Sequence, residues 1–131
     1  MENSLLGLQA EAFSNGAARG VRYLKQLTDR RVGPNLSRLA ELDPGLPEQG
    51  ADVGDILDLL ETVGGEGTVA TAAGRYFGYV IGGALPAASA ARALLSAWDQ
   101  VADGLTGPSV IKMEETAVSW IVRLLGLPEG T

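Results

Sequence analysis

The 131-residue chain contains no cysteine and no histidine. Without cysteine it has no disulfide framework and no thiol chemistry, and without both residues the usual zinc ligands are missing. The lack of histidine also excludes nucleophilic catalysis of the Ser-His type. No glycine-rich stretch matches the P-loop or the dinucleotide-binding fingerprint. We therefore expect no metal site and no catalytic residue within this chain.

Aromatic residues are scarce, at 5%, so a core must be built from Leu, Val, Ile and Ala. The longest uncharged apolar run, between Arg75 and Arg92, is shorter than the roughly 20 residues of a membrane span, and Pro86 and several glycines interrupt it. The first residues carry no basic region typical of a signal peptide. The net charge of −6 argues against nucleic acid, which binds basic surfaces. These features predict a cytoplasmic protein that binds neither nucleic acid nor membrane.

The charges that are present are segregated along the chain. A basic block consists of Arg19, Arg22, Lys25, Arg30, Arg31 and Arg38. The stretch 41–66 then contains eight acidic residues and no lysine or arginine. This pattern is typical of two ordinary solvated helix faces, and a docking surface with two charged poles is the alternative.

Hydrophobic periodicity predicts a mostly α-helical chain. Glycines 16 and 20 weaken the middle of the first helix and can divide it in two, and Gly64-Gly65 marks the end of a later helix that Asp52 caps. The predicted helices cover residues 3–29, 35–42 with its leucines inward, 52–63, about 84–102, and from Pro108 or Ser109 to Leu125.

The last predicted helix is apolar around most of its circumference. Its polar residues form one narrow stripe, made by Lys112, Glu115, Ser119 and Arg123. Such a helix needs cover on more than one side, so we expect missing chain or a partner subunit to pack on it. Glu114 falls on its apolar side, where a carboxylate requires a partner or a shifted pKa; a structural hydrogen bond explains it better than catalysis.

The segment 66–83 differs from the rest because it has no helical period and is rich in glycine. It also holds three of the five Tyr and Phe residues. Glycine lets a backbone approach another backbone or a ligand closely, and loops that carry aromatic residues are common binding elements. The G-x-x-x-G spacing of Gly78 and Gly82 reflects chance or local packing in so short a run.

Several short motifs follow one another in a recognisable order. They are Tyr23-Leu24, Arg31-Val32-Gly33-Pro34, Arg75-Tyr76-Phe77-Gly78, Leu85-Pro86-Ala87, Ser96-Ala97-Trp98-Asp99-Gln100, Pro108, Glu114, Trp120 and Leu124-Leu125-Gly126-Leu127-Pro128. From Val21 to the end, this order and spacing resembles the N-terminal region of the group II amino-acid decarboxylases, which include the aromatic-amino-acid and glutamate decarboxylases. The sequence departs from the family at Ala73-Gly74, Asp99-Gln100 and Gly107-Pro108, where His-Pro, Asn-Gln and Ser-Pro are usual, and these changes bear on substrate identity more than on fold.

The resemblance implies the N-terminal helical segment of a fold-type-I, transferase-like α/β enzyme that works as an intertwined homodimer. Residues 1–65 would wrap the neighbouring subunit, 66–83 would form a substrate-side loop, and 84–131 would lead as two long helices into the cofactor domain. Residues that would line the substrate are Tyr76, Phe77, Gly78, Tyr79 and Ile81, and the Tyr79 hydroxyl can also hydrogen-bond. The alternative is that these aromatic side chains belong to a core.

The family's cofactor is pyridoxal phosphate, which accepts the electron pair left when carbon dioxide departs from an amino acid. The family places its Schiff-base lysine, ring-nitrogen carboxylate, stacked histidine and phosphate cup downstream of the region present here. Lys25 and Lys112 are the only lysines, and neither follows a histidine. The chain alone is therefore expected to bind no cofactor and to be inactive, with a second subunit or the remainder of the enzyme as partner. The alternative is a stand-alone, non-catalytic helical interaction module.

Overall fold

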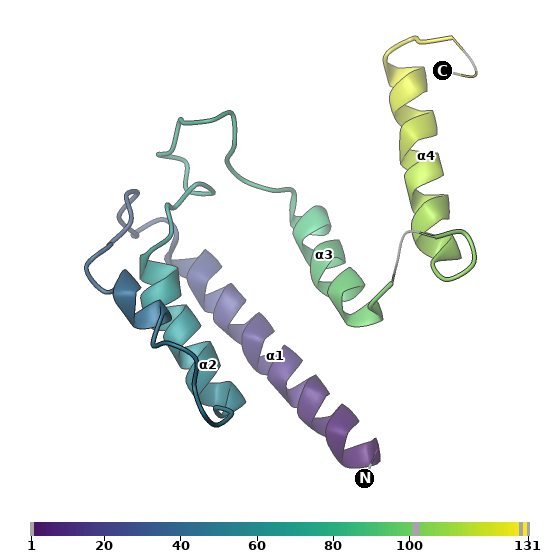
Figure 1. Ribbon diagram of the computed structural model, residues 1–131. Helices are drawn as coiled ribbons and strands as arrows, with labels where there is room; N and C mark the ends of the chain where they lie inside the picture. The colour runs from purple at the N-terminus through teal and green to yellow at the C-terminus, as the bar shows by residue number, and fades with distance from the viewer. Residues whose placement is uncertain (1, 101–102, 129, 131) are drawn as a thin grey trace. The chain divides into compact units, whose positions relative to one another are not determined.

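The computed structural model describes residues 2–100, 103–128 and 130, with side chains from residue 5 onward. Over these residues the chain is mostly helical and has no strand, which confirms the prediction of a mostly α chain. Its elements are α1 (Glu2–Gln26), η1 (Leu39–Leu42), α2 (Val53–Leu59), η2 (Leu60–Gly64), α3 (Pro86–Trp98) and α4 (Pro108–Leu124), drawn in Figure 1. The chain forms two compact units, Met1–Pro86 and Ala87–Thr131, each of which is described by itself.

In the first unit, α1 is one continuous helix with α2 lying beside it (Figure 1). The predicted division at Gly16 and Gly20 is wrong. Ala17, Ala18 and Arg19 between the two glycines are good helix formers, and a single glycine only weakens a helix. The helix ends at Gln26, three residues before the predicted end. The chain turns there so that Leu27 is buried against Ala70 and Ala73, which form the small core.

The helix predicted over residues 52–63 has the predicted cap but a different course. Asp52 accepts a hydrogen bond from the Gly54 backbone N–H at 2.7 Å. After Leu59 the helix continues without a break into the π-helical turn η2, which buries Val63. The predicted stop at Gly64-Gly65 is wrong: Gly65 keeps a helical backbone, and the chain turns at Gly67, whose N–H bonds the Val63 carbonyl at 3.0 Å.

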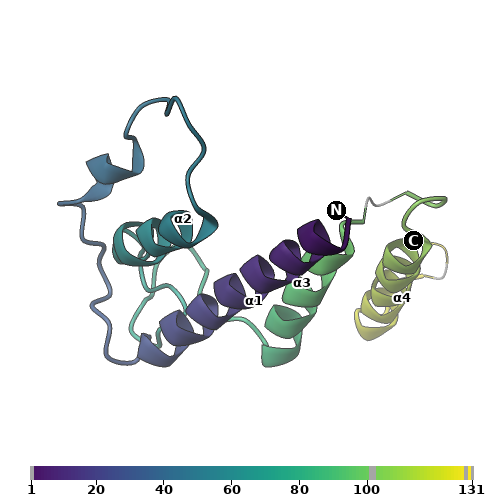
Figure 2. The ribbon, with the colours of Figure 1, turned by 90° about the horizontal axis from the view of Figure 1, so that it is seen from below.

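The helix predicted over residues 35–42 shrinks to the four-residue 3₁₀-helix η1. Asn35 competes with a helix here, because its side-chain oxygen accepts hydrogen bonds from the Ser37 N–H and hydroxyl. Its own backbone N–H donates to the Glu66 carbonyl at 2.9 Å, which ties this segment to the end of η2. Leu36 and Leu42, predicted to point inward, are exposed. Figure 2 shows that the loop between η1 and α2 extends away from the helices.

The second unit contains most of α3 and all of α4. Helix α3 is shorter than predicted and ends at Trp98, where Asp99 takes a left-handed backbone with φ of 48°. The predicted helical residues 101–102 lie outside the described part of the chain. Helix α4 follows the prediction, with Pro108 in its first turn. Gly126 ends it with φ of 64°.

None of the helices in the described ranges combines the length and the hydrophobicity that crossing a bilayer requires.

Candidate functional site

The predicted substrate-side loop is tied to the end of α1 by an arginine. The Arg75 guanidinium donates hydrogen bonds to the backbone carbonyls of Thr28, at 3.0 Å, and of Arg30. These carbonyls lie just beyond α1, where backbone acceptors have no partner within the helix. The Tyr76 N–H then closes a turn onto the Ala73 carbonyl at 3.1 Å. The start of the loop is thereby fixed to the first unit.

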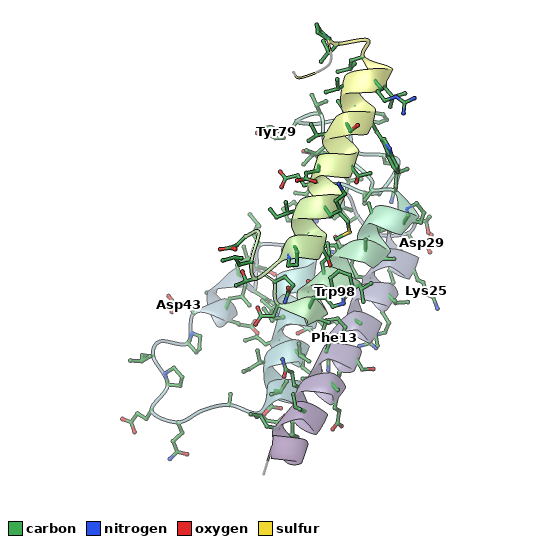
Figure 3. All side chains as sticks on the ribbon, turned by 90° about the vertical axis from the view of Figure 1, so that its right-hand side faces the viewer. Phe13, Lys25, Asp29, Asp43, Tyr79 and Trp98 are labelled. Carbon is green, nitrogen blue, oxygen red and sulfur yellow. The ribbon has the colours of Figure 1, made fainter. Side chains whose placement is uncertain are left out.

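Beyond this anchor, the tip of the loop presents its side chains to solvent. Phe77 is 93% exposed and Tyr79 91% exposed, and Figure 3 labels Tyr79 on the loop. Tyr79 and Val80 both have left-handed backbones, with φ of 56° and 53°, in a turn closed by the Ile81 N–H and the Gly78 carbonyl at 3.3 Å. This conformation is unfavourable for a β-branched residue such as Val80. The turn therefore holds its side chains outward at a cost in backbone strain.

The five predicted substrate-lining residues differ in how far the structure exposes them. The half-buried Tyr76 packs over Gly78, where a Cβ atom would lie 2.6 Å from the Tyr76 hydroxyl oxygen. Phe77, Tyr79 and Ile81 are exposed within the first unit. Within the first unit they form an outward-facing tip instead of an enclosed pocket.

A cluster of ion pairs joins α1 to α2 and η2, and the sequence interpretation missed it. Arg19 lies 2.6 Å from an Asp58 oxygen and 2.7 Å from a Glu61 oxygen. Arg22 binds both Glu61 oxygens, each at 2.8 Å. These hydrogen bonds, from Arg22 first, together with the positive charge of Arg22 and Arg19, hold the pKa of Glu61 below its ordinary value.

This cluster departs from the interpretation of the segregated charges as two solvated helix faces at two residues of the basic block. Arg19 and Arg22 contact the acidic stretch within the first unit, whereas most other charged residues of the two segments are exposed. The sequence did contain a signal for this cluster. Arg19 and Arg22 are three residues apart, and so are Asp58 and Glu61, which places each pair on one face of its helix. Nothing in the sequence indicated that these two faces would meet.

A second polar cluster fastens the chain after η2 onto the end of α1. The Arg30 guanidinium lies over the Tyr23 ring, 4.7 Å from its centroid, and donates to the Thr68 hydroxyl and the Gly65 carbonyl. The Tyr23 and Thr68 hydroxyl oxygens are 2.9 Å apart. These groups bind one another and tie the chain after η2 to the end of α1, while the buried Nε of Arg30 has no hydrogen-bond partner among the described residues.

A shallow groove of about 220 Å³ lies between α1 and the helix that follows it. The residues that line it are Gly16, Arg19, Gly20, Tyr23, Leu57, Leu60, Glu61 and Gly65. Its surface is mainly apolar, and its charged members Arg19 and Glu61 already pair with each other. The groove therefore has no free charged group with which to hold a phosphate or a metal ion.

The residues of this chain do not fit pyridoxal phosphate. The cofactor requires a lysine in a closed site, whereas Lys25 lies exposed on α1, and Lys112 lies exposed on α4 and pairs with Glu115 at 3.1 Å. The chain has no histidine to stack on the ring. Among the described residues, no group of three or more acidic side chains is placed to hold a metal ion.

Helix α4 is uncovered within its own unit. None of its residues is buried, and Trp120 and Leu124 are among its exposed apolar side chains. Glu114, for which a structural hydrogen bond was expected on an apolar side of the helix, is exposed to solvent among the described residues of this unit. None of the described residues of the second unit buries a residue of this helix.

No protein-family model, curated protein or solved structure matches this chain.

Proposed function

We propose that this chain is the N-terminal part of a pyridoxal-phosphate-dependent group II amino-acid decarboxylase of fold type I. In that role it supplies dimer contacts and substrate-side residues, and it is inactive alone. The complete enzyme would release the α-carboxylate of an L-amino acid as carbon dioxide. The observation that carries the proposal is the ordered set of motifs from Tyr23-Leu24 to Leu124-Leu125-Gly126-Leu127-Pro128.

The outward-facing loop tip supports this role. A substrate-side loop that serves an active site outside its own unit must project its side chains away from that unit. Phe77 and Tyr79 do so, while Arg75 holds the base of the loop in place. The Tyr79 hydroxyl at the tip is then free to donate to or accept from a polar group of an amino-acid substrate.

The bare surface of the second unit supports the same role. Helix α4 exposes Met113, Val118, Trp120 and Ile121 along one length of helix. Large exposed apolar patches usually mark a surface that binds protein. We assign this cover to the cofactor domain, which would also provide the Schiff-base lysine and the phosphate cup that this chain lacks.

The test is to read the genomic reading frame downstream of the codon for Thr131. We expect it to encode a His-Lys pair, and the extended chain to show the absorbance band of the lysine–cofactor Schiff base and to release carbon dioxide from an L-amino acid. The matched control replaces Lys25 and Lys112 by arginine in the extended chain, which should leave the band unchanged. Tyr79→Phe should raise KM more than it lowers kcat, because its hydroxyl would bind substrate. A continuation without a lysine-containing cofactor site would overturn the proposal.

The second candidate is a stand-alone helical interaction module without catalysis. The same uncovered face of α4 favours it, because that surface can bind an unrelated protein as well as a cofactor domain. The extended chain separates the two candidates: an interaction module would gain neither the Schiff-base band nor carbon dioxide release.

A further inference from the structure

A small cavity with both positive and negative groups on its walls lies just beyond the end of α1. It has a volume of about 170 Å³ and is lined by Arg30, Arg31, Gly33, Asn35 and Glu66. Two guanidinium groups and one carboxylate therefore share one space. Within the described ranges no ion pair joins Glu66 to either arginine, so the opposite charges line the cavity without neutralising each other directly.

Backbone hydrogen bonds hold the two segments that form the cavity walls. The Asn35 N–H donates to the Glu66 carbonyl at 2.9 Å, and the Ala70 N–H donates to the Val32 carbonyl at 3.0 Å. The Asn35 side chain also donates to a carboxylate oxygen of Glu66 at 3.2 Å. Because the two segments are fastened to each other at both ends, a ligand that enters the cavity has little backbone to order, which lowers the cost of binding.

The guanidinium of Arg30 is held in place but only partly occupied. Its Nη2 donates to the Gly65 carbonyl and to the Thr68 hydroxyl, and the group lies over the Tyr23 ring. Its Nε is buried without a partner, and its Nη1 donates to no described residue. An arginine whose fork is already fixed loses little further side-chain entropy when it binds an anion.

Arg31 contributes a second positive charge to the cavity. It is exposed, and it has no hydrogen bond or ion pair from its side chain to the part of the chain that the structure describes. A Cβ atom on Gly33 would lie 4.0 Å from the Arg31 Nε, which places this side chain beside the cavity floor. Asp29, labelled in Figure 3, is the nearest acidic residue in the sequence, but it does not line the cavity.

We propose that this cavity binds a small zwitterion, a molecule with one carboxylate and one ammonium group, of which a free amino acid is the simplest example. The ligand carboxylate would accept hydrogen bonds from Arg30 and Arg31, whose planar forks match a carboxylate. The ligand ammonium would donate to Glu66, which as a carboxylate only accepts. At about 170 Å³ the cavity is smaller than the roughly 300 Å³ of sites for drug-sized molecules, so it suits a ligand of few heavy atoms.

The carboxylate of Glu66 favours a zwitterion over a simple anion. A phosphate or sulfate ion in the cavity would place its negative charge near that of Glu66, and like charges brought together weaken binding. Arg38 does not remove this repulsion, because it binds Glu41 through two hydrogen bonds of 2.7 Å. A simple cation would meet the two guanidinium groups instead. Only a ligand that carries both charges is attracted by both walls.

This site is independent of the proposed function. It lies within the first unit and uses neither the cofactor nor the exposed tip of the loop. A chain whose continuation encodes no cofactor site should therefore bind the zwitterion equally well, and an active decarboxylase that does not bind it here would retain the decarboxylase role and lose this site.

The test measures binding of glycine to the full chain by two-dimensional NMR of the backbone amides. The ionic strength is kept low and constant, because salt screens exposed charges. Glycine should shift the amides of Gly33, Asn35 and Glu66 along a saturable curve, with a millimolar dissociation constant. Acetate and methylammonium each carry one of the two charges and should bind at least about tenfold more weakly, since each loses a charged hydrogen bond. Acetate that binds as tightly as glycine would show an anion site only and overturn the proposal, as would the lack of a saturable shift.

Two variants test the two walls separately, with folding checked by circular dichroism. Arg31→Gln should weaken glycine and acetate alike by about tenfold, because both lose a charged donor. Glu66→Gln should weaken glycine to the affinity of acetate without weakening acetate, because the amide oxygen can still accept from Asn35 but offers no charge to the ammonium. Arg92→Gln, on exposed α3, and Tyr79→Phe, on the loop tip, are the controls and should change neither affinity. Glycine binding that survives both Arg31→Gln and Glu66→Gln would place the ligand elsewhere and reject this site.

Discussion

Among individual residues, Glu61 makes the most consequential contacts between elements. Its carboxylate binds Arg22 through both oxygens and Arg19 through one, and thereby joins η2 to α1. The side chain of Arg19 is 15% exposed, so its charge would be poorly solvated without these partners. A two-oxygen contact with arginine is stronger and more directional than a single ion pair.

Replacement of this carboxylate by an amide should destabilise the first unit. Because its folded-state pKa is lowered, Glu61 contributes stability above its unfolded-state pKa and loses it as the pH falls through the folded-state value. We therefore expect Glu61→Gln to lower the thermal midpoint at pH 7, with a smaller difference in acid. Glu48→Gln is the matched control, since Glu48 is exposed and makes no ion pair among the described residues. Equal midpoints for the two variants at pH 7, followed by circular dichroism, would contradict this role.

Arg75 should matter through geometry rather than charge. Its guanidinium reaches two carbonyls beyond α1, and a lysine ammonium cannot reproduce that fork. We expect Arg75→Lys to cost on the order of 1 kcal/mol of unfolding free energy, the usual size of a lost hydrogen bond. Hydrogen exchange should also quicken at the Ala73 and Tyr76 amides, which close the turns that lead into the loop. Arg92→Lys, on exposed α3, should change neither quantity; a similar effect there would point to a general loss of stability.

At the scale of elements, the sequence predicted which segments are helical better than where they end. Helix α4 was predicted well because Pro108 and Gly126 mark its ends through purely local backbone chemistry. The other boundaries depend on tertiary contacts. Helix α1 ends where Leu27 enters the core. The helix after Asp52 continues through Gly65, and Glu61 of η2 binds Arg19 and Arg22 of α1.

The candidate site was predictable in composition but not in form. Glycine and aromatic residues marked 66–83 as irregular, and residues 67–85 contain no helix or strand. The left-handed turn at Tyr79 and Val80 had no signal, because neither residue favours that backbone. The ion-pair cluster also escaped prediction, since it depends on two segments about 40 residues apart meeting in space.

The effect on stability of replacing a glycine by alanine should depend on the backbone conformation at that glycine and not on its burial. Gly16 lies in the middle of α1, and no atom lies within 4 Å of the position that an alanine methyl group would take, so Gly16→Ala should stabilise the helix by about 0.5–1 kcal/mol. Gly126 also has open space, but its φ of 64° is unfavourable for alanine. Gly126→Ala should therefore destabilise the end of α4 by about 1 kcal/mol. Unfolding in urea measures both changes, and shifts of the same sign would refute the distinction.

At the scale of the whole molecule, the two units are stabilised by different kinds of interaction. The first unit has a buried core, two polar clusters and hydrogen bonds between distant segments. In the second unit, the described side-chain hydrogen bonds span at most four residues. Local bonds of this kind open with little free energy, so unit 2 should exchange its amides faster than the core of unit 1.

Both tryptophans lie in the second unit, so their fluorescence reports whether other protein packs on that unit. Trp98 is 43% exposed and Trp120 is 62% exposed. We expect the isolated chain to emit at wavelengths typical of water-exposed indole and to be quenched by acrylamide. Trp98→Phe and Trp120→Phe assign the signal to each ring. In the extended chain of the proposed enzyme, the emission should shift to the blue as protein covers α4. A blue emission from the isolated chain, lost in a cooperative transition, would show that α4 is already sheltered and would remove this support for an absent cofactor domain.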